Sequence, residues 1–337
     1  MITSELKNLF DQFHRLKILV IGDVMVDRYI RGNVDRISPE APVPVVIVSG
    51  HEDHLGGAAN VALNIKALGG TPILASSIGS DETGNAFLNL MKKEGLSAEA
   101  IQKSDKPTTL KMRIMGNNHQ LLRVDEEDDR PMVEPQAEQF RKMIIALIQE
   151  NNIDGIIFED YDKGLIDEKL IREVVREAGE KSIPVSVDPK RRNFSFYRNV
   201  TLFKPNLKEI REGLKIEADP TNKISISNAD QELRKLLNHK YSLITLSEHG
   251  SYASEPSGSS FIPAHVRKIS DVSGAGDTVI GVASMCLAAG IDIHSIAFLS
   301  NLAGGLVCEK PGVVPIDSVQ LFEEAMRFIE TRKKSDS

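Results

Sequence analysis

The segment Asp271-Val-Ser-Gly-Ala-Gly-Asp277-Thr-Val-Ile-Gly281 is the most informative part of this 337-residue sequence. Gly274 and Gly276 give the backbone conformations and close approaches that larger residues do not allow. The apolar residues from Asp277 to Ala289 predict a helix, and Gly290 is placed to end it. We therefore predict a tight glycine turn that leads directly into a helix.

The same turn has the chemistry of a phosphoryl-transfer site. The N–H groups of Ala275, Gly276 and Asp277 would lie at the positive end of the helix, where a developing anion is stabilised. Beside them, the Asp277 carboxylate can take a proton from an attacking hydroxyl. The alternative is that Asp277 only stabilises the helix dipole, and the turn alone does not decide between the two.

The rest of the chain alternates short β-branched runs with helical periodicity, which predicts an α/β fold. Amphipathic helices are expected at 140–148 and 170–178. We predict a parallel sheet with helices on both faces. Five runs have the pattern of buried strands: 18–21, 155–158, 184–187, 200–203 and 242–246.

Each predicted strand runs directly into polar residues. The five strands are followed by Asp23, Glu159-Asp160, Asp188, Lys204 and Ser247. Ligands of open α/β sheets bind beyond the carboxyl ends of the strands. The sequence therefore predicts a single crevice at that edge.

Two segments interrupt the alternation, and we predict that they form a small β lid. In residues 29–49 three prolines, at positions 39, 42 and 44, stand beside Val43 and the β-branched run 45–48, and residues 108–125 alternate around a turn at Gly116-Asn117-Asn118. A lid over the crevice would exclude water during the reaction. An extended surface loop is the alternative for both segments.

A second glycine pair precedes another apolar helical stretch, in Leu55-Gly-Gly-Ala-Ala-Asn60. Gly56 and Gly57 would let a polyol approach the backbone, and the Asn60 amide can both donate to and accept from hydroxyl groups. The alternative is a tight turn in which Asn60 only satisfies backbone groups.

The segment Asn206-Leu-Lys-Glu209 follows a predicted strand and begins a helix. Asn206 and Glu209 are three residues apart, so they share one helix face and can order the waters of a Mg²⁺ ion. An asparagine cap with glutamate at the third helical position has the same spacing. The two interpretations are compatible.

Composition limits the partners of the protein. The 41 basic and 48 acidic residues give a net charge of −7, which argues against nucleic acid or an anionic membrane, although a cleft can be locally basic. The sequence shows no apolar run long enough for a bilayer and no signal-peptide core. Cys286 and Cys308 are too few for a disulfide framework. We therefore expect a cytoplasmic protein that binds small molecules.

The two glycine motifs and the Asn206 segment together resemble the ribokinase-like (PfkB) carbohydrate kinases. In that family Gly-Gly-x-x-Asn comes early and Asp-x-x-Gly-Ala-Gly-Asp comes late, and the likeness runs from Ile18 to about Glu330. The resemblance implies a ribokinase-like α/β fold with a β lid, in a single kinase domain over residues 1–337. It also implies ATP and Mg²⁺ as cofactors, and it leaves a K⁺ requirement open.

A closer likeness is to the kinase portion of the heptose-phosphate kinases. It implies transfer of the γ-phosphoryl of ATP to C1 of D-glycero-D-manno-heptose 7-phosphate, giving the 1,7-bisphosphate on the way to ADP-heptose and lipopolysaccharide cores. Many such enzymes continue into a nucleotidyltransferase domain, whereas this sequence ends at Ser337, so phosphorylation without adenylylation is expected. The segments that carry the likeness are Gly22–Tyr29, Arg36–Val46, Asp160–Gly164, Asp188–Lys190 and Ser270–Gly281.

The resemblance also implies roles for single positions. Asp277 would be the base, with Gly274, Ala275 and Gly276 as the anion hole. The lid would make the contact of a homodimer. The sugar hydroxyls would be held by Asp27, Gly56, Gly57 and Asn60. The nucleotide would be bound by Asn206, Leu207, Lys208, Glu209, Ser247, Gly250 and Asn301, with Mg²⁺ at Asn206 and Glu209.

A phosphorylated substrate requires cations, because Arg and Lys are the usual phosphate ligands. We expect two or three of the following to bind the distal phosphate, with a solvated surface role as the alternative for each. Three alternate on the predicted lid strands (Lys111, Arg113 and Arg123), and two follow strand ends (Lys163 and Lys190). Arg191 and Arg192 are further candidates.

Three other functions fit parts of the sequence. A ribokinase-like kinase for another sugar, sugar phosphate or nucleoside would share every motif. A ligand sensor that has lost turnover would keep the fold, but the intact Asp277 and its glycines argue against it. An NAD-dependent oxidoreductase lacks support because the sequence has no Gly-x-Gly-x-x-Gly after its first strand.

Overall fold

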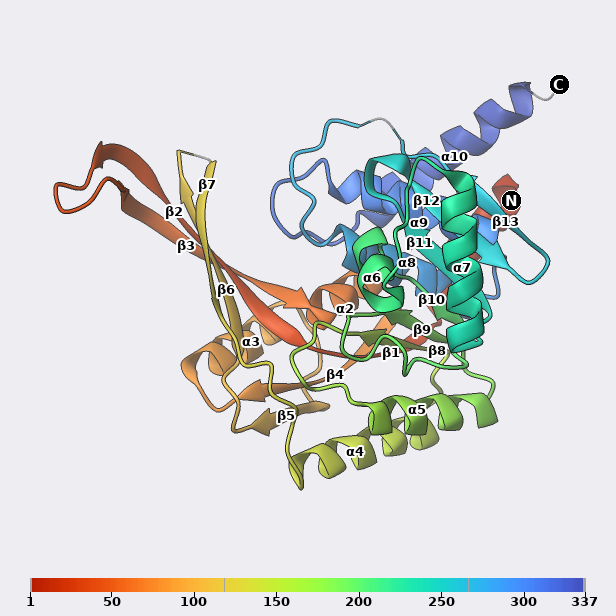
Figure 1. Ribbon diagram of the computed structural model, residues 1–337, viewed down its shortest axis with the longest axis horizontal. Coiled ribbons are helices and arrows are strands. Elements are labelled where there is room, and N and C mark those ends of the chain that lie inside the picture. The colour runs from red at the N-terminus through yellow and green to blue at the C-terminus, as the bar shows by residue number, and fades with distance from the viewer. Residues whose placement is uncertain (1, 118, 266, 336–337) are drawn as a thin grey trace.

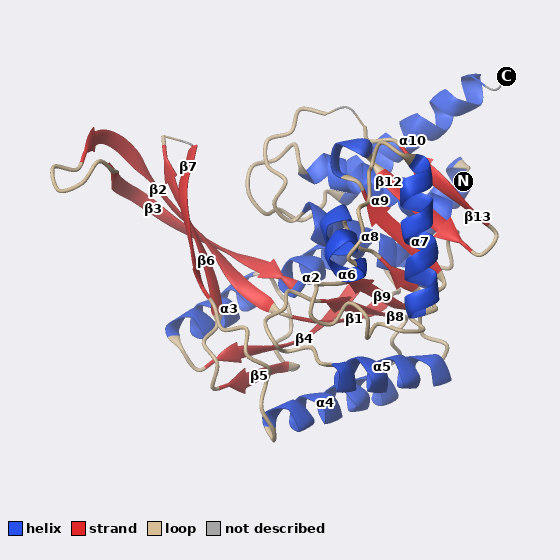
Figure 2. Ribbon diagram, in the orientation of Figure 1, coloured by secondary structure: helices blue, strands red, loops and turns tan. Residues whose placement is uncertain are grey.

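A nine-stranded sheet forms the centre of the computed structural model, which describes residues 2–117, 119–265 and 267–335 (Figures 1 and 2). Seven adjacent strands, from β11 at one end to β5 at the other, pair in parallel. β12 and β13 extend the sheet beyond β11 in antiparallel pairing. The spatial order is β13 (Gly258–Ile262), β12 (Ser251–Glu255), β11 (Tyr241–Thr245), β10 (Leu202–Phe203), β9 (Val185–Asp188), β8 (Gly155–Glu159), β1 (Lys17–Gly22), β4 (Thr71–Gly79) and β5 (Ile101–Ser104).

Helices cover both faces of this sheet, as the sequence predicts. In β1, Ile18 and Val20 enter one core while Leu19 and Ile21 enter the other, because side chains alternate along a strand. One face carries α1 (Thr3–Phe13), α2 (Ala58–Ala67), α3 (Glu82–Lys93), α8 (Ala275–Ala288), α9 (Ile293–Val307) and α10 (Ser318–Ser335). The other carries α4 (Gln136–Glu150), α5 (Glu168–Glu180), α6 (Leu207–Leu214) and α7 (Lys223–Leu237).

The five strands expected from the sequence are β1, β8, β9, β10 and β11. β10 is shorter than predicted and holds only Leu202 and Phe203. Just before β10, the N–H of Val185 in β9 donates to the Thr201 hydroxyl at 3.0 Å. A side chain therefore takes the place of the backbone carbonyl that would continue the β9–β10 pairing. The helices expected at 140–148 and 170–178 lie within α4 and α5.

A second sheet of four strands projects from the main body as the lid (Figure 1). Its order is β3 (Pro44–Gly57), β2 (Val24–Ile37), β6 (Thr109–Gly116) and β7 (His119–Glu126), and only β2 and β6 are parallel. The lid segments are strands rather than loops, but β2 begins before residue 29 and β3 ends after residue 49. The reason is that β1 continues into β2 with only Asp23 between them. Of the predicted turn, Asn118 lies outside the described residues.

Two further properties follow from the described ranges of the chain. Within them, none of the helices combines the length and the apolar character needed to cross a membrane. Cys286 and Cys308 are both free and buried, in agreement with the expectation that they form no disulfide.

Candidate active site

The glycine turn at the start of α8 forms the centre of the site. Gly274 has φ = 77°, a left-handed conformation that favours glycine, and a side chain there would also approach Nδ2 of Asn60 to 2.8 Å. The N–H of Ala275 differs from expectation because it donates to the Val272 carbonyl at 3.3 Å. The N–H groups of Gly276 and Asp277 have no hydrogen-bond partner in the described part of the chain. The turn therefore offers two free donors at the positive end of the helix.

The Asp277 carboxylate lies next to Asn60, as the two glycine motifs predict. Nδ2 of Asn60 donates to Oδ2 of Asp277 at 2.8 Å, and both residues are buried. The Tyr161 hydroxyl donates to the other oxygen, Oδ1, at 2.7 Å. Asn60 sits on α2, Tyr161 follows β8, and Asp277 begins α8, so three distant segments meet at this acid.

Burial raises the pKa of Asp277 to about 6, which is the direction expected when a carboxylate is removed from water. The hydrogen bonds from Asn60 and Tyr161 oppose this shift because they stabilise the ionised form, while the nearby Asp188 adds to it. A base with a pKa just below neutral is ionised at physiological pH and still accepts a proton readily. These are the properties required of a general base.

The residues expected at the sugar lie on the lid strands and at the start of α2. Asp27 on β2 is buried and is held by the Arg113 guanidinium of β6. A Cβ atom at Gly56 of β3 would overlap the Asp27 carboxylate, so only glycine leaves this acid in place. Gly57 has φ = 62° and directly precedes α2, which carries Asn60. The residues expected at the sugar hydroxyls are therefore neighbours.

A cluster of buried charges lies beside the glycine turn at the ends of β8, β9 and β10. Lys204 Nζ is 2.8 Å from Oδ2 of Asp188, and a Cβ at Gly276 would lie 3.7 Å from the same oxygen. Lys190 pairs with Glu209. For both lysines burial would lower the pKa, but Asp188 and Glu209 outweigh it and raise the pKa. Both ammonium groups are therefore charged.

Glu159 belongs to the same cluster. Its side chain is fully buried, and neither carboxylate oxygen has a hydrogen-bond partner among the described residues. Burial raises its pKa well above the usual range, and Asp188 and Asp277 add to the shift. Ionisation of this carboxyl group is therefore disfavoured in the folded protein.

Asn206 and Glu209 form the helix cap that the sequence allows. The Asn206 side chain accepts the N–H of Glu209 at 2.9 Å, and the Glu209 carboxylate accepts the N–H of Asn206 at 2.8 Å. Their oxygens are engaged with the backbone and with Lys190, and no group of three or more His, Cys, Asp or Glu in the described ranges is placed to hold a metal. Carboxylate and amide oxygens can still accept hydrogen bonds from metal-bound water. The pair therefore fits a hydrated Mg²⁺ ion whose other ligands are nucleotide phosphates.

The other residues expected at the nucleotide fall into two groups. Ser247, in the 3₁₀ turn Ser247–His249, and Gly250 follow β11, and Gly250 packs against the carbonyl of Ile262. Asn301 on α9 donates to the Pro263 carbonyl at 2.9 Å, so Gly250 and Asn301 meet at residues 262–263, and the Ser247 carbonyl accepts the N–H of Gly250 at 3.1 Å. In contrast, Leu207 is only half-buried, and Lys208 extends into solvent toward Glu212.

The candidate phosphate cations divide between two places. Lys111 and Lys163 meet at Glu127, with distances of 3.4 and 2.8 Å to its Oε2. Arg113 is bound to Asp27, and Lys190 lies with Glu209 near the candidate nucleotide residues. The remaining arginines are peripheral: Arg123 pairs with Asp125, Arg192 pairs with Asp129, and Arg191 is exposed.

Four residues in the site were given no individual role by the sequence, although three of them, Glu159, Asp188 and Lys204, are among the strand-end residues that predict the crevice. Tyr161, Asp188 and Lys204 touch or face the glycine turn, and Glu159 lies among them. The one signal available was position, since each lies at or just after the end of a buried strand. That signal marks the edge of the sheet without identifying which side chains turn toward Asp277.

Comparison with known proteins agrees with this geometry. The model of the pfkB family carbohydrate kinases matches residues 15–318. The D-beta-D-heptose 7-phosphate kinase of Bordetella bronchiseptica is 38% identical over 318 residues, covering 94% of this chain and 98% of that protein. The bifunctional protein HldE of Methylobacillus flagellatus is 38% identical over 308 residues, and this chain spans 91% of its own length but 62% of the length of HldE.

Solved structures share the fold at low sequence identity. Phosphofructokinase-2 from Escherichia coli, in complex with potassium, has a TM-score of 0.77 at 17% identity, over 94% of this chain and 99% of that one. Ribokinase from Arabidopsis thaliana, complexed with ribose and ATP, has a TM-score of 0.70 at 16% identity, over 91% and 99% of the two chains. With a ribokinase-like fold, a family match over most of its length and both glycine motifs joined at Asp277, the chain belongs to the pfkB family of carbohydrate kinases.

Proposed function

We propose that this carbohydrate kinase transfers the γ-phosphoryl of ATP to C1 of D-glycero-D-manno-heptose 7-phosphate, in the synthesis of ADP-heptose. The observation that supports this proposal most is the contact between the buried side chains of Asp277 and Asn60. Beside it are the N–H groups of Gly276 and Asp277, which have no partner among the described residues. The names and 38% identity of the heptose-phosphate relatives support the choice of sugar. We further propose that the chain acts as one kinase domain in the cytoplasm.

The proposed reaction follows from the site. The C1 hydroxyl oxygen attacks the γ-phosphorus, the bond from that phosphorus to the bridging β–γ oxygen breaks, and ADP leaves. The hydroxyl proton passes to the Asp277 carboxylate. The N–H groups of Gly276 and Asp277 stabilise the charge on the transferred group, which is the main catalytic requirement of this chemistry.

ATP and a divalent metal accompany this family of reactions. We propose that Asn206 and Glu209 hold the Mg²⁺ through water, and that Ser247, Gly250 and Asn301 border the adenosine. When bound, the ion neutralises phosphate charge. The charged ammonium group of Lys204 lies 3.9 Å from the position of a Cβ at Gly276, and Lys190 pairs with Glu209 in the same cluster, so both are available to assist. A K⁺ requirement is tested by measuring the rate with K⁺ and with Na⁺.

The distal phosphate of the sugar is assigned to Lys111 and Lys163. Both ammonium groups already converge on one acid, Glu127, although they come from the lid and from the loop after β8. Convergent cations of this kind bind phosphate. Arg113 is held on Asp27, so its contact to the phosphate would be made from the sugar side.

We also propose a homodimer that forms through the lid. The register of the lid places Asp27, Lys111 and Arg113 on one face and an apolar set on the other. Of the apolar set, Leu122 and Val124 are 55% and 37% exposed. Contiguous exposed apolar residues mark interfaces. The apolar set is Ile30, Met112, Ile114, Leu122 and Val124.

A substrate panel tests the proposed function. Heptose 7-phosphate, unphosphorylated heptose, ribose and fructose 6-phosphate are each incubated with ATP and Mg²⁺, and the products are followed by ³¹P NMR. We expect heptose 7-phosphate to have the highest kcat/KM and to give a new anomeric phosphate signal. A preference for any other acceptor would reject the proposed sugar, and the Asp277→Asn protein serves as the inactive control.

A further inference from the structure

Tyr161 contacts the general base, yet the reaction described above gives it no part. Its hydroxyl donates to Oδ1 of Asp277 at 2.7 Å. The other donor to this acid, Asn60, is fully buried on a helix, whereas Tyr161 is partly exposed on a loop. Of the two donors, Tyr161 is therefore the less buried residue.

The loop that carries Tyr161 is fixed from behind by Asp23. The Asp23 carboxylate accepts the N–H groups of Tyr161, Lys163 and Leu165 at 2.9, 3.2 and 3.4 Å. Three backbone bonds to one buried acid hold the loop in a single conformation.

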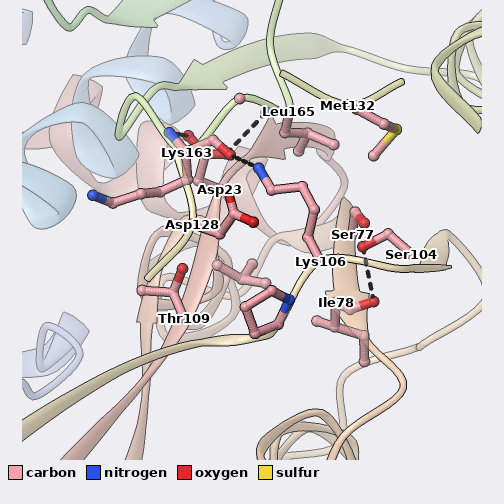
Figure 3. A pocket seen from close by; sticks show the side chains of 13 residues that line it. Asp23, Ser77, Ile78, Ser104, Lys106, Thr109, Asp128, Met132, Lys163 and Leu165 are labelled. Atoms are coloured by element: carbon pink, nitrogen blue, oxygen red, sulfur yellow. Dashed lines mark hydrogen bonds between the residues drawn. The ribbon is translucent and has the colours of Figure 1, made fainter. Parts of the chain in front are cut away.

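Lys106 adds a second support to the same loop. Its ammonium donates to the carbonyl of Lys163 and, at 2.5 Å, to the carbonyl of Arg130. Figure 3 shows Lys106 beside Asp23 and Lys163 in a cavity of about 30 Å³. A cavity of that size holds only about two waters. It is therefore too small for a sugar, and the lysine serves to hold the loop.

The ring of Tyr161 is also held at its other side. Nζ of Lys190 lies 5.3 Å from the ring centroid, a cation–π contact. The ring therefore lies between a lysine of the charged cluster and the base. The phenol itself stays protonated, because burial and the nearby Asp277 raise the pKa of Tyr161 well above its usual value.

The ionisable groups around Asp277 lie at or just after the ends of β8, β9 and β10. β8 contributes Glu159, β9 contributes Asp188, and Lys204 follows β10. α2 contributes the neutral amide of Asn60, and Lys190 lies behind the phenol ring. Burial and Asp188 disfavour the ionised carboxylate, so the base depends on its two hydrogen-bond donors and on Lys204 to stay charged.

We propose that Tyr161 is a positioning residue for the general base, whose hydroxyl holds Oδ1 of Asp277 toward the acceptor hydroxyl and keeps the carboxylate ionised. This inference rests on the proposed function, since it deepens the role of the same site. During transfer the sugar proton moves to Asp277, and Tyr161 keeps its own proton throughout. Tyr161 therefore acts through Asp277 and not on the phosphoryl group.

The test is the pH profile of kcat/KM for Tyr161→Phe, which removes one hydroxyl and keeps the ring. Loss of a hydrogen bond to a charged group is worth about one to two pH units. We expect the acid limb to move upward by that amount, with a loss of activity of about fivefold to fiftyfold at pH 6. Most of the activity should return at pH 9. A loss that is equal at all pH values would overturn the proposal.

Tyr197→Phe is the matched control. The Tyr197 hydroxyl donates to Oδ2 of Asp160 at 2.7 Å, at the end of the same strand but on the opposite face. This variant also loses one buried hydroxyl from the region, yet it leaves Asp277 untouched. Its acid limb should match that of the unmodified protein, and an equal shift in both variants would reject a specific role for Tyr161.

A second measurement does not depend on the substrate. ¹³C NMR of the Asp277 carboxyl group, assigned with Asp277→Asn, gives its titration midpoint in the sugar-free protein. The midpoint should rise in Tyr161→Phe and stay constant in Tyr197→Phe. An unchanged midpoint in Tyr161→Phe counts against the role of Tyr161 alone, whereas failure of the substrate panel counts against the proposed function alone.

Discussion

At the level of single residues, Asp277 combines its proposed role in proton transfer with a cost to the stability of the fold. Its pKa is raised from 3.8 to about 6, so the folded protein binds this proton more tightly than the unfolded chain does. For such a group stability falls as pH rises through the window from about 4 to about 6. The base is therefore ionised at the expense of stability.

The variant Asp277→Asn separates these two properties. We expect kcat to fall by about 10²- to 10⁴-fold, with the dissociation constant for ATP nearly unchanged. Because the variant cannot ionise, its stability relative to the unmodified protein should rise by up to about 3 kcal/mol between pH 4 and pH 7. Denaturant unfolding at several pH values measures this difference. A stability difference that does not change with pH would show that burial does not raise the pKa of Asp277. Near-normal turnover would refute its role as base.

Gly56 tests the sugar side at the same scale. A Cβ there would overlap the Asp27 carboxylate, so Gly56→Ala should displace Asp27 and raise the KM for the sugar on the order of tenfold to a hundredfold. The KM for ATP should stay the same. Gly50→Ala on the same strand is the control, because nothing lies within 4 Å of the added carbon. Equal effects of both changes would exclude a contact between Asp27 and the sugar.

At the level of elements, Asp81 connects α3 to the lid. Its Oδ1 accepts the N–H of Gly84 at 2.7 Å as the helix cap, and its Oδ2 accepts the N–H of Thr108, next to the start of β6, at 2.7 Å. Burial alone would raise the pKa of Asp81, but these hydrogen bonds outweigh it and lower the pKa. The stabilisation is therefore present above the usual pKa of an aspartate and is lost as pH falls through the lowered value.

The variant Asp81→Ala is expected to lower the free energy of unfolding by more than the loss of a helix cap does. Loss of an N-cap costs about 1 kcal/mol, and here the start of a lid strand is released as well. Asp292→Ala on α9 is the comparison, since Asp292 caps only its own helix through His294 and Ser295. Thermal unfolding should show the larger loss for Asp81→Ala, and only this variant should raise the KM for the sugar. Identical behaviour of both variants would contradict the link to the lid.

The sequence predicts the presence of elements with a strong apolar periodicity more accurately than it predicts the residues at which they begin and end. β1 and α4 are recognised because their apolar residues follow the strand and helix periods. β10 is shortened by one side-chain bond from Thr201, and β2 is lengthened because it continues β1, and neither event has a local pattern. In the site, Asp277 and Asn60 carry glycine motifs. Tyr161 does not, and it meets Asp277 across 116 positions of sequence.

At the level of the whole molecule, the apolar face of the lid predicts the oligomeric state. Leu122→Glu places a charge on this face and should convert a dimer to a monomer, measured by light scattering after size-exclusion chromatography. Ile224→Glu is the control, since Ile224 is 72% exposed on α7 in the main body. A monomeric unmodified protein, or an unchanged dimer in Leu122→Glu, would reject the lid as the interface.

The junction between the two sheets has a mechanical consequence. Only Asp23 separates β1 from β2, Gly57 leads straight into α2, and the N–H of Ala58 donates to the Asp23 carbonyl at 3.0 Å. The 14-residue β2 is about 45 Å long at roughly 3.3 Å per residue. A rotation of β2 by about 5° about this junction would therefore move its far end by about 4 Å. Asp23 also anchors the loop of Tyr161, so β2 and this loop are attached to the same residue. We therefore expect a rotation of the lid about Asp23 to shift the loop that carries Tyr161 as well.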